Sequence, residues 1–238
     1  MSELTVDGIS AGYAGTDVLR GVSVSVAPGE CVAVLGANGA GKSTLLKVLS
    51  GQLKIRSGTR TIDGDNVKAW SPHRAARSGV RWIGEPRPIY PSLSVAENLE
   101  VGGLTARSSI DGQRQRVYEL LPALYEKRTH RAASLSGGQQ QMLAIGQALM
   151  SKPRYLCLDE PSLGLSPAMV NTVAQLVSDL VGEGVGAVWA EQFPEVAKAH
   201  CTKLIVLRAG VVVTHGQPET ITSDELERAY LGGDGADR

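Results

Sequence analysis

Apolar and polar residues alternate at the start of the chain, in the segments 4–9 and 18–26. This spacing is typical of strands that bury one face and expose the other. In the second segment, Val22, Val24 and Val26 fall on a single face. The pattern predicts antiparallel strands that form a β-subdomain covering an edge of the molecule.

Short uninterrupted apolar runs follow, beginning with the segment 31–35, and glycines and a helical stretch at 42–49 come directly after it. Strands that are buried on both faces of a parallel sheet have this composition. Helical patterns at 168–180 and 194–199 lie between later runs of the same kind. Those later runs occupy residues 80–83, 155–158, 187–190 and 203–207. The alternation of strand and helix predicts an α/β core.

The strand pattern disappears between residues 86 and 150, which predicts an inserted helical subdomain. We expect helices there at 95–101, 112–121 and 139–150. After the core, valines at 211–213 predict a terminal hairpin and residues 223–230 a capped helix. One domain is therefore expected over residues 1–238. Its core and β-subdomain comprise residues 1–85 and 151–231, and its helical subdomain comprises residues 86–150. Residues 232–238 are expected to form a frayed tail.

The charged residues balance, with 24 Lys and Arg against 24 Asp and Glu, and the two signs are interspersed. This composition argues against a nucleic-acid partner, which would favour a broad cationic face. Three widely spaced cysteines suit reduced, buried thiols, and the four histidines lack metal-ligand spacing. No signal peptide or long apolar span is expected. We therefore expect a cytoplasmic protein that reaches a membrane only through a separate integral protein.

A glycine-rich segment separates the first predicted buried strand from the helical stretch that follows it. It matches GxxxxGK[ST], the phosphate loop, in which backbone N–H groups and a helix N-terminus surround a β-phosphate. Lys42 supplies charge for the β- and γ-oxygens, and the Ser43 hydroxyl is a candidate Mg²⁺ ligand. The candidate ATP-binding residues are Gly36, Asn38, Gly39, Gly41, Lys42, Ser43 and Thr44. The alternative is a glycine-rich turn, and kinases, GTPases and motors share this motif.

An acidic pair, Asp159 and Glu160, ends the predicted strand at 155–158. The carboxyl ends of parallel strands form the edge at which open α/β sheets bind ligands. Asp159 is therefore a candidate Mg²⁺ ligand, and Glu160 is the candidate general base that orients or deprotonates an attacking water. The alternative is a pair of helix-capping acids ahead of Pro161.

A second candidate anion site lies at the start of the predicted helix 139–150. Its serine and glycines offer a hydroxyl and bare amides, although a plain turn and cap has the same residues. The segment comprises Leu135, Ser136, Gly137, Gly138 and Gln139. This segment lies between the phosphate loop and the acid pair in the chain, and it resembles the signature of the ABC ATPases. The resemblance implies a P-loop NTPase fold of the ABC type, Mg²⁺-dependent ATP hydrolysis, and two ATP molecules held between two subunits facing head to tail.

Further residues extend the resemblance over nearly the whole chain. Tyr13 matches the family's aromatic that stacks on adenine, with an edge-strand or core aromatic as the alternative. The segment 161–165 matches the loop that touches the partner subunit. Glu85 stands where most members have glutamine, and Gln192 where most have a switch histidine. Glu85 can ligate Mg²⁺ and Gln192 can donate to the γ-phosphate, so both join Lys42 and Glu160 as catalytic candidates; the alternative is two solvated surface side chains.

These two departures, with the run at 139–146 and the ending at 229–233, resemble the ATP-binding subunits of branched-chain amino acid and related amide or urea importers. That resemblance implies a second ABC ATPase subunit and integral membrane permease subunits as partners, with the permease contacting 87–95. The chain would then be peripheral on the inner face of the cell membrane. The alternatives are a soluble ABC ATPase acting on ribosomes, DNA or Fe–S assembly, and a phosphate-loop kinase or GTPase, which would leave the signature without a reason.

Overall fold

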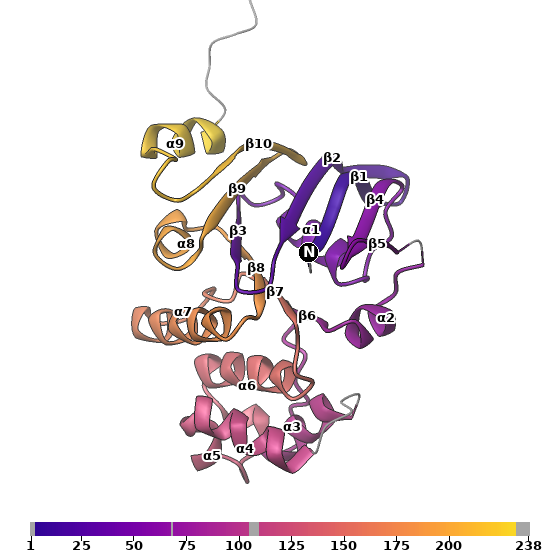
Figure 1. Ribbon diagram of the computed structural model, residues 1–238. Helices are drawn as coiled ribbons and strands as arrows, with labels where there is room; N and C mark the ends of the chain where they lie inside the picture. The colour runs from indigo at the N-terminus through magenta and orange to yellow at the C-terminus, as the bar shows by residue number, and fades with distance from the viewer. Residues whose placement is uncertain (1–2, 68, 105–109, 232–238) are drawn as a thin grey trace, which may run out of the picture.

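The structure is a computed structural model that describes residues 3–67, 69–104 and 110–231 (Figure 1). The tail predicted at 232–238 lies outside these ranges. The strands are β1 Leu4–Tyr13, β2 Thr16–Val26, β3 Cys31–Leu35, β4 Ser57–Ile62, β5 Asp65–Asn66, β6 Val80–Ile83, β7 Tyr155–Asp159, β8 Gly186–Glu191, β9 Lys203–Arg208 and β10 Val211–Gly216. The helices are α1 Lys42–Leu49, α2 Pro72–Arg77, α3 Val95–Gly103, α4 Ile110–Leu120, α5 Pro122–Glu126, the 3₁₀ helix η1 Ala132–Ser134, α6 Gly137–Leu149, α7 Pro167–Gly182, α8 Pro194–His200 and α9 Ser223–Leu231.

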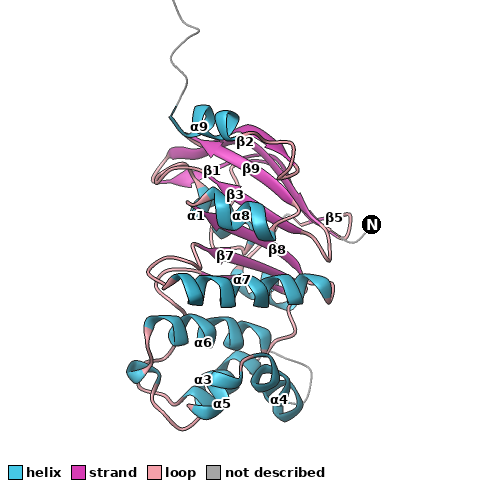
Figure 2. Cartoon of the chain, turned by 90° about the vertical axis from the view of Figure 1, so that its left-hand side faces the viewer, coloured by secondary structure: helices cyan, strands magenta, loops and turns pink. Residues whose placement is uncertain are grey.

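In the described part of the chain, six strands form the central sheet in the order β10-β9-β3-β8-β7-β6. All of its neighbouring pairs are parallel except β9 and β10, which form the predicted hairpin. β3 and β8 are buried along their whole length. Helices α7 and α8 lie on one face of the sheet (Figure 2), and α1 packs on the other. These layers confirm the predicted α/β core.

The second sheet is antiparallel, with the order β2-β1-β4-β5. Its register places Val22, Val24 and Val26 of β2 opposite Ile9, Val6 and Leu4 of β1, and all six side chains are buried. They form one hydrophobic cluster with the apolar residues of α1. Helix α1 therefore lies between the two sheets, and the predicted antiparallel unit holds the helix that follows the phosphate loop.

Helices α3 to α6 lie together below the central sheet in the view of Figure 1. Their apolar side chains belong to the same hydrophobic cluster as those of α7 and α8, on the face of the sheet that these two helices cover. The helices expected at 95–101, 112–121 and 139–150 are α3, α4 and α6, displaced by at most two residues at each end. Five described elements were not predicted, because their sequences are short and mostly exposed. They are β4, β5, α2, α5 and η1.

The three cysteines are buried free thiols. Burial raises the pKa of Cys157 to about 12, so this thiol stays protonated near neutral pH. Over the described ranges, no helix combines the length and the apolar composition needed to cross a bilayer.

Candidate nucleotide-binding site

The phosphate loop (P-loop) follows the end of β3, and β3 lies between β8 and β9 in the central sheet. Gly36 has φ 151°, and a Cβ there would lie 2.3 Å from the Leu207 carbonyl oxygen. Gly41 precedes α1 with φ 110°, and its Cβ would lie 2.8 Å from Cδ2 of Leu19. Side chains at these two positions would clash, so the loop needs glycine at both ends. Asn38 is exposed between them, where the loop amides and the start of α1 can receive an anion.

Lys42 is buried at the base of this loop, with 4% of its side chain exposed. Its Nζ donates to the Gly36 carbonyl oxygen at 2.9 Å and lies 3.1 Å from Oε1 of Glu160. The structure thus joins two of the predicted catalytic residues directly. The lysine is not the solvated side chain of the alternative interpretation.

Ser43 and Asp159 meet at the carboxyl edge of the sheet, where Ser43 Oγ donates to Asp159 Oδ1 at 2.8 Å. Burial raises the pKa of the Asp159 carboxyl above its ordinary value; the Ser43 hydrogen bond opposes this shift and the Glu160 charge adds to it. A hydroxyl and a carboxylate are oxygen donors of the kind that Mg²⁺ prefers. The described residues hold no cluster of three or more His, Cys, Asp or Glu side chains that could bind a metal ion.

Glu160 leaves β7 with φ +47°, in the left-handed region that few residues other than glycine adopt. Its N–H donates to the Ala190 carbonyl oxygen at 3.0 Å, and 20% of its side chain is exposed. Helix α7 begins only at Pro167 and is capped by the Ser166 hydroxyl. The acid pair is therefore not a helix cap, and its strained backbone is typical of a functional site.

Glu191 was not predicted as a site residue, yet its carboxylate holds two loops of the site together. The side chain is 1% exposed. Oε2 accepts from Ser162 Oγ at 2.6 Å and from Trp189 Nε1 at 3.2 Å, and Oε1 accepts from the Gln192 N–H at 2.9 Å. The loop after the acid pair is thus tied to Gln192. Its only sequence signal was a carboxylate directly after the predicted apolar strand 187–190.

Tyr230 of α9 is the second residue that sequence reasoning missed. Its hydroxyl accepts from the Gly36 N–H at 3.2 Å and donates to the Gln192 carbonyl oxygen at 3.1 Å. Burial raises the pKa of Tyr230 to about 12, which keeps this donor protonated. The last described helix therefore connects the P-loop to the Gln192 segment, and its spacing in the sequence gave no indication of this contact.

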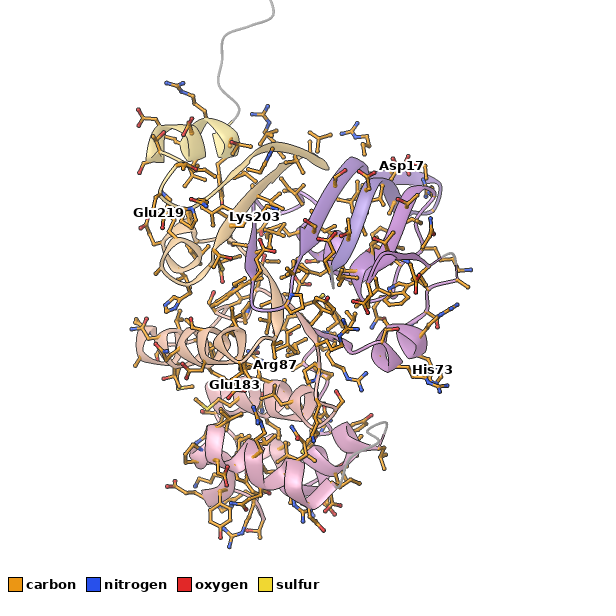
Figure 3. All side chains as sticks on the ribbon, in the orientation of Figure 1. Asp17, His73, Arg87, Glu183, Lys203 and Glu219 are labelled. Atoms are coloured by element: carbon orange, nitrogen blue, oxygen red, sulfur yellow. The ribbon has the colours of Figure 1, made fainter. Side chains whose placement is uncertain are left out.

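Glu85 comes off the same edge as the acid pair, because β6 runs parallel to β7 with Ile83 beside Leu158. Its side chain is 59% exposed, and Oε1 lies 3.9 Å from Nη2 of Arg87. Among the described contacts, none joins Glu85 to Ser43 or Asp159. Arg87 also donates from Nε to Gln141 Oε1 at 2.7 Å, and Figure 3 shows it between the strands and α6. The segment after β6 is thus connected to α6.

Tyr13 ends β1 at the hairpin opposite Thr16. Its ring is 46% exposed, so it is not the core aromatic of the alternative interpretation. An exposed ring offers a surface on which a base can stack.

The predicted signature lies at the start of α6, away from α1 in Figure 1. Ser136 caps the helix, since its Oγ accepts from the Gln139 N–H at 3.3 Å while Gln139 Oε1 accepts from the Ser136 N–H at 3.1 Å. The hydroxyl proton stays available because the oxygen is the acceptor. Leu135 and Gly138 are buried, whereas Ser136 and Gly137 are exposed. The predicted anion site and the helix cap therefore use the same residues, and the cap leaves the hydroxyl free to donate.

Comparisons with known proteins place this geometry in a family. The ABC transporter family matches residues 19–163. The high-affinity branched-chain amino acid transport ATP-binding protein BraG of Pseudomonas aeruginosa is 40% identical, over 97% of this chain and 100% of its own length. The lipopolysaccharide export system ATP-binding protein LptB of Escherichia coli is 31% identical, over 98% and 99%.

Solved structures agree with the sequence relatives. The ADP conformation of MJ1267, an ATP-binding cassette of an ABC transporter, superposes with a TM-score of 0.88 and 25% identity, over 98% of this chain and all of its own. A nucleotide-free cassette from an ABC transporter has a TM-score of 0.84 and 25% identity, over 96% and 95%. Fold, site and family coincide: this chain belongs to the ABC transporter family, as a nucleotide-binding subunit that hydrolyses ATP to drive transport.

Proposed function

We propose that this chain powers an importer of branched-chain amino acids, or of related amides or urea. The observation that carries the proposal is the 40% identity to BraG along the whole length of both chains. The 31% identity to LptB over the same span supports a lipopolysaccharide exporter less well. The Glu85 and Gln192 pair supports it independently, because both residues resemble those of the importer group.

The test is expression of the chain with candidate permeases, followed by affinity purification and an uptake assay. Co-purification with a multispanning permease and ATP-dependent uptake of branched-chain amino acids or an amide is expected. Stable capture of ribosomes at physiological salt, without any membrane protein, would contradict the proposal.

We propose that the chain lies at the inner face of the membrane and that the segment after Glu85 contacts the permease there. Tyr90 is 50% exposed there, and Asn98 holds its backbone from both sides, with Oδ1 accepting at 2.7 Å and Nδ2 donating at 3.0 Å. An exposed ring on a rigid loop is suited to an interface. Tyr90→Ser should weaken permease co-purification while the isolated chain keeps its ATPase rate. Equal capture of Tyr90→Ser and the unmodified chain would rule out this surface.

For the reaction, the proposal assigns Ser43 and Asp159, with Glu85 as a further ligand, to Mg²⁺. The ion supplies positive charge against the phosphate oxygens. Lys42 contacts the phosphates of ATP and in doing so gives up its ion pair with Glu160. The freed carboxylate then orients and deprotonates the attacking water. Nucleotide binding thereby prepares the base.

Gln192 is proposed to donate its side-chain amide to the γ-phosphate. An amide does not titrate near neutral pH, whereas histidine does. The ATPase rate should therefore show no rate-controlling ionisation near a pH of about 6.5, and Gln192→His should introduce one. An ionisation in that range that disappears when Gln192 is replaced by alanine would disprove this role.

The proposal also requires a second ABC ATPase subunit, either a copy of this chain or a related one. Its support is the exposed pair Ser136 and Gly137 at the start of α6. A second subunit would bring its ATP phosphates to this helix start. Size-exclusion chromatography of Glu160→Gln with ATP and Mg²⁺ should show a dimer, and with a related chain added should show which pairing forms. Persistent monomers under both conditions would exclude the arrangement.

A further inference from the structure

Strand β4 carries an arginine on its buried face. The burial of the strand alternates so that Arg60 and Ile62 point inward, and Arg60 is paired in register with Val6. Only 2% of Arg60 is exposed, in a region otherwise filled by apolar residues such as Val67 and Trp70. Charged side chains are rarely buried to this degree without an ionic partner.

The guanidinium of Arg60 lacks such a partner among the described residues. Its Nε and Nη2 atoms are buried without a hydrogen bond, and no carboxylate forms an ion pair with it. Its Cζ lies 5.5 Å from the centre of the Trp70 ring, whose Nε1 donates to the Leu49 carbonyl oxygen at 2.8 Å. Burial lowers the pKa of Arg60 to about 10, which leaves the charge in place at neutral pH. The ring compensates for part of the lost hydration, and the N–H groups stay unsatisfied.

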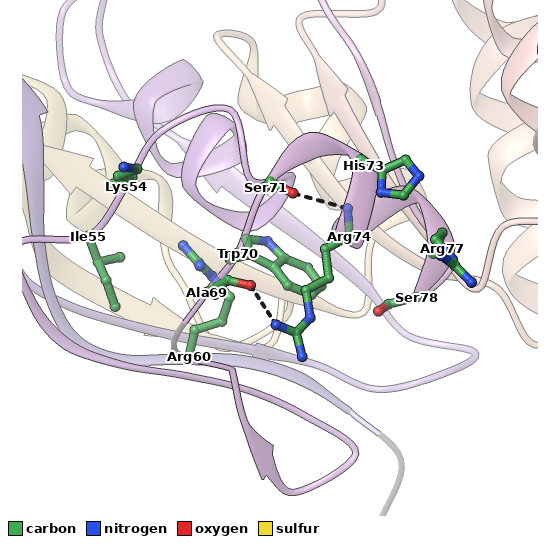
Figure 4. Close-up of a pocket in the computed structure, with 10 residues that line it drawn as sticks. All are labelled: Lys54, Ile55, Arg60, Ala69, Trp70, Ser71, His73, Arg74, Arg77 and Ser78. Atoms are coloured by element: carbon green, nitrogen blue, oxygen red, sulfur yellow. Dashed lines mark hydrogen bonds between the residues drawn. The ribbon is translucent and has the colours of Figure 1, made fainter.

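Arg60 lines a pocket of about 960 Å³ between β4, α2 and the loop after α1 (Figure 4). Figure 4 shows the Arg60, Trp70 and Arg74 side chains around the same hollow, and Figure 3 shows His73 on α2 at the outside of the molecule. Arg74 is held in place by its Nη1, which donates to the Ala69 carbonyl oxygen at 3.0 Å. The described lining residues are Lys54, Ile55, Arg60, Ala69, Trp70, Ser71, His73, Arg74, Arg77 and Ser78. None of them is acidic, so several positive charges face one cavity without an anion.

We propose that this pocket binds a phosphate-bearing anion, with Arg60 at its base and Arg74, Arg77 and Lys54 around its mouth. A guanidinium offers a planar fork of N–H donors that matches phosphate oxygens, and clustered arginines are the usual means of recognising phosphate. A compact tetrahedral anion with more than one negative charge fits several cations better than a single carboxylate does. The pocket shares no lining residue with the P-loop, so this site is separate from that for ATP.

The experiment titrates the chain with pyrophosphate while ADP saturates the P-loop, and measures binding by calorimetry. Arg60→Met keeps a long side chain but removes the guanidinium, and should weaken binding by at least about tenfold. Arg131→Met, an exposed arginine elsewhere, is the matched control and should bind like the unmodified chain. The double variant Arg74→Ala with Arg77→Ala alters only exposed side chains, so it tests the pocket even if Arg60→Met fails to fold.

A second arm distinguishes a free phosphate compound from a lipid headgroup. Vesicles of phosphatidylcholine with phosphatidic acid are compared with phosphatidylcholine alone by co-sedimentation. Binding that depends on Arg60, or on the Arg74 and Arg77 pair, supports the site with either probe. The probe that binds shows whether the site takes a free phosphate compound or a lipid headgroup. Unchanged affinity in these variants, or a chain that binds neither probe, overturns the proposal. Binding of a polyglutamate peptide through Arg60 without phosphate binding would overturn it as well, in favour of an acidic protein partner.

Discussion

The P-loop edge and the start of α6 are both suited to bind phosphate, but the chain completes them to different degrees. At the P-loop edge the polar side chains already engage one another, Lys42 with Glu160 and Ser43 with Asp159. At α6 the exposed residue Ser136 uses its hydroxyl oxygen to accept from the N–H of its own cap residue, Gln139, and no other hydrogen bond of that hydroxyl is found among the described residues. One site is thus assembled within the chain, whereas the other leaves its serine at an exposed helix start, as the proposed second subunit requires.

The strongest test of the first region removes the proposed base. Glu160→Gln keeps the shape of the side chain but cannot accept a proton, so ATP turnover should fall by about 10²–10⁴-fold while ADP binding is retained. The matched control is Glu195→Gln, an exposed acid in the first turn of α8, which should leave the rate unchanged. Steady-state ATPase assays of the two variants provide the comparison. A fully active Glu160→Gln variant would remove Glu160 from the chemistry.

The second test separates the two roles of the α6 start. Ser136→Ala and Ser94→Ala each delete the serine of a capping box, in α6 and α3 respectively. Both should cost about 0.5–2 kcal/mol of stability, because each leaves N-terminal amides uncapped. Only Ser136→Ala should also reduce ATP turnover, by roughly tenfold through the lost phosphate contact. Thermal unfolding measures the loss of the cap, and ATPase assays measure the loss of the phosphate contact. Equal activity of the two variants would mean that Ser136 serves only as a helix cap.

A smaller effect is expected from the carboxylate that joins two loops of the first region. Glu191→Gln removes the charge that accepts from Ser162, Trp189 and the Gln192 amide. Because this residue positions others, kcat should fall by about five- to tenfold while KM for ATP stays the same. Glu195→Gln again serves as the control. A rise in KM at unchanged kcat would instead place Glu191 in nucleotide binding.

Tyr230→Phe tests whether α9 supports the P-loop. Loss of one hydroxyl that bridges Gly36 and Gln192 should cost about 0.5–1.5 kcal/mol, which corresponds to roughly two- to tenfold in kcat/KM. Tyr125→Phe, with a ring that is 49% exposed on α5, is the matched control. If both variants behave alike, the bridge has no functional consequence.

The smallest effect concerns stability without nucleotide. The raised pKa of Asp159 means that folding favours its protonated form, so the ionised carboxylate destabilises the fold at neutral pH. Asp159→Asn should therefore raise the melting temperature near neutral pH. The gain should shrink as the pH falls below the raised native pKa, where the wild-type carboxyl takes up its proton, and should be lost at the ordinary carboxyl pKa of about 4. A stability difference that is constant with pH, or that grows on acidification, would contradict this assignment.

Much of the molecule could be predicted from local patterns. The buried strands, the helices and the P-loop follow from apolar spacing, glycine placement and flanking elements, and these features need only neighbouring residues. The short elements β4, β5, α2, α5 and η1 could not be predicted, because mostly exposed segments of two to six residues carry no clear periodicity. Arg60 was missed for the same reason, since a charged residue in an exposed-looking segment gives no sign of burial.

The sequence by itself determined the order of strands and helices and the motifs at their ends, because these depend on short-range steric and hydrophobic preferences. Only the tertiary structure decided which of those ends meet. Ser43 and Asp159 are 116 residues apart in the chain, and Gly36 and Tyr230 are 194 apart. Parallel strand pairing brings the first pair to one edge of the sheet. The packing of α9 against β9 brings the second together, and no local pattern encodes such contacts.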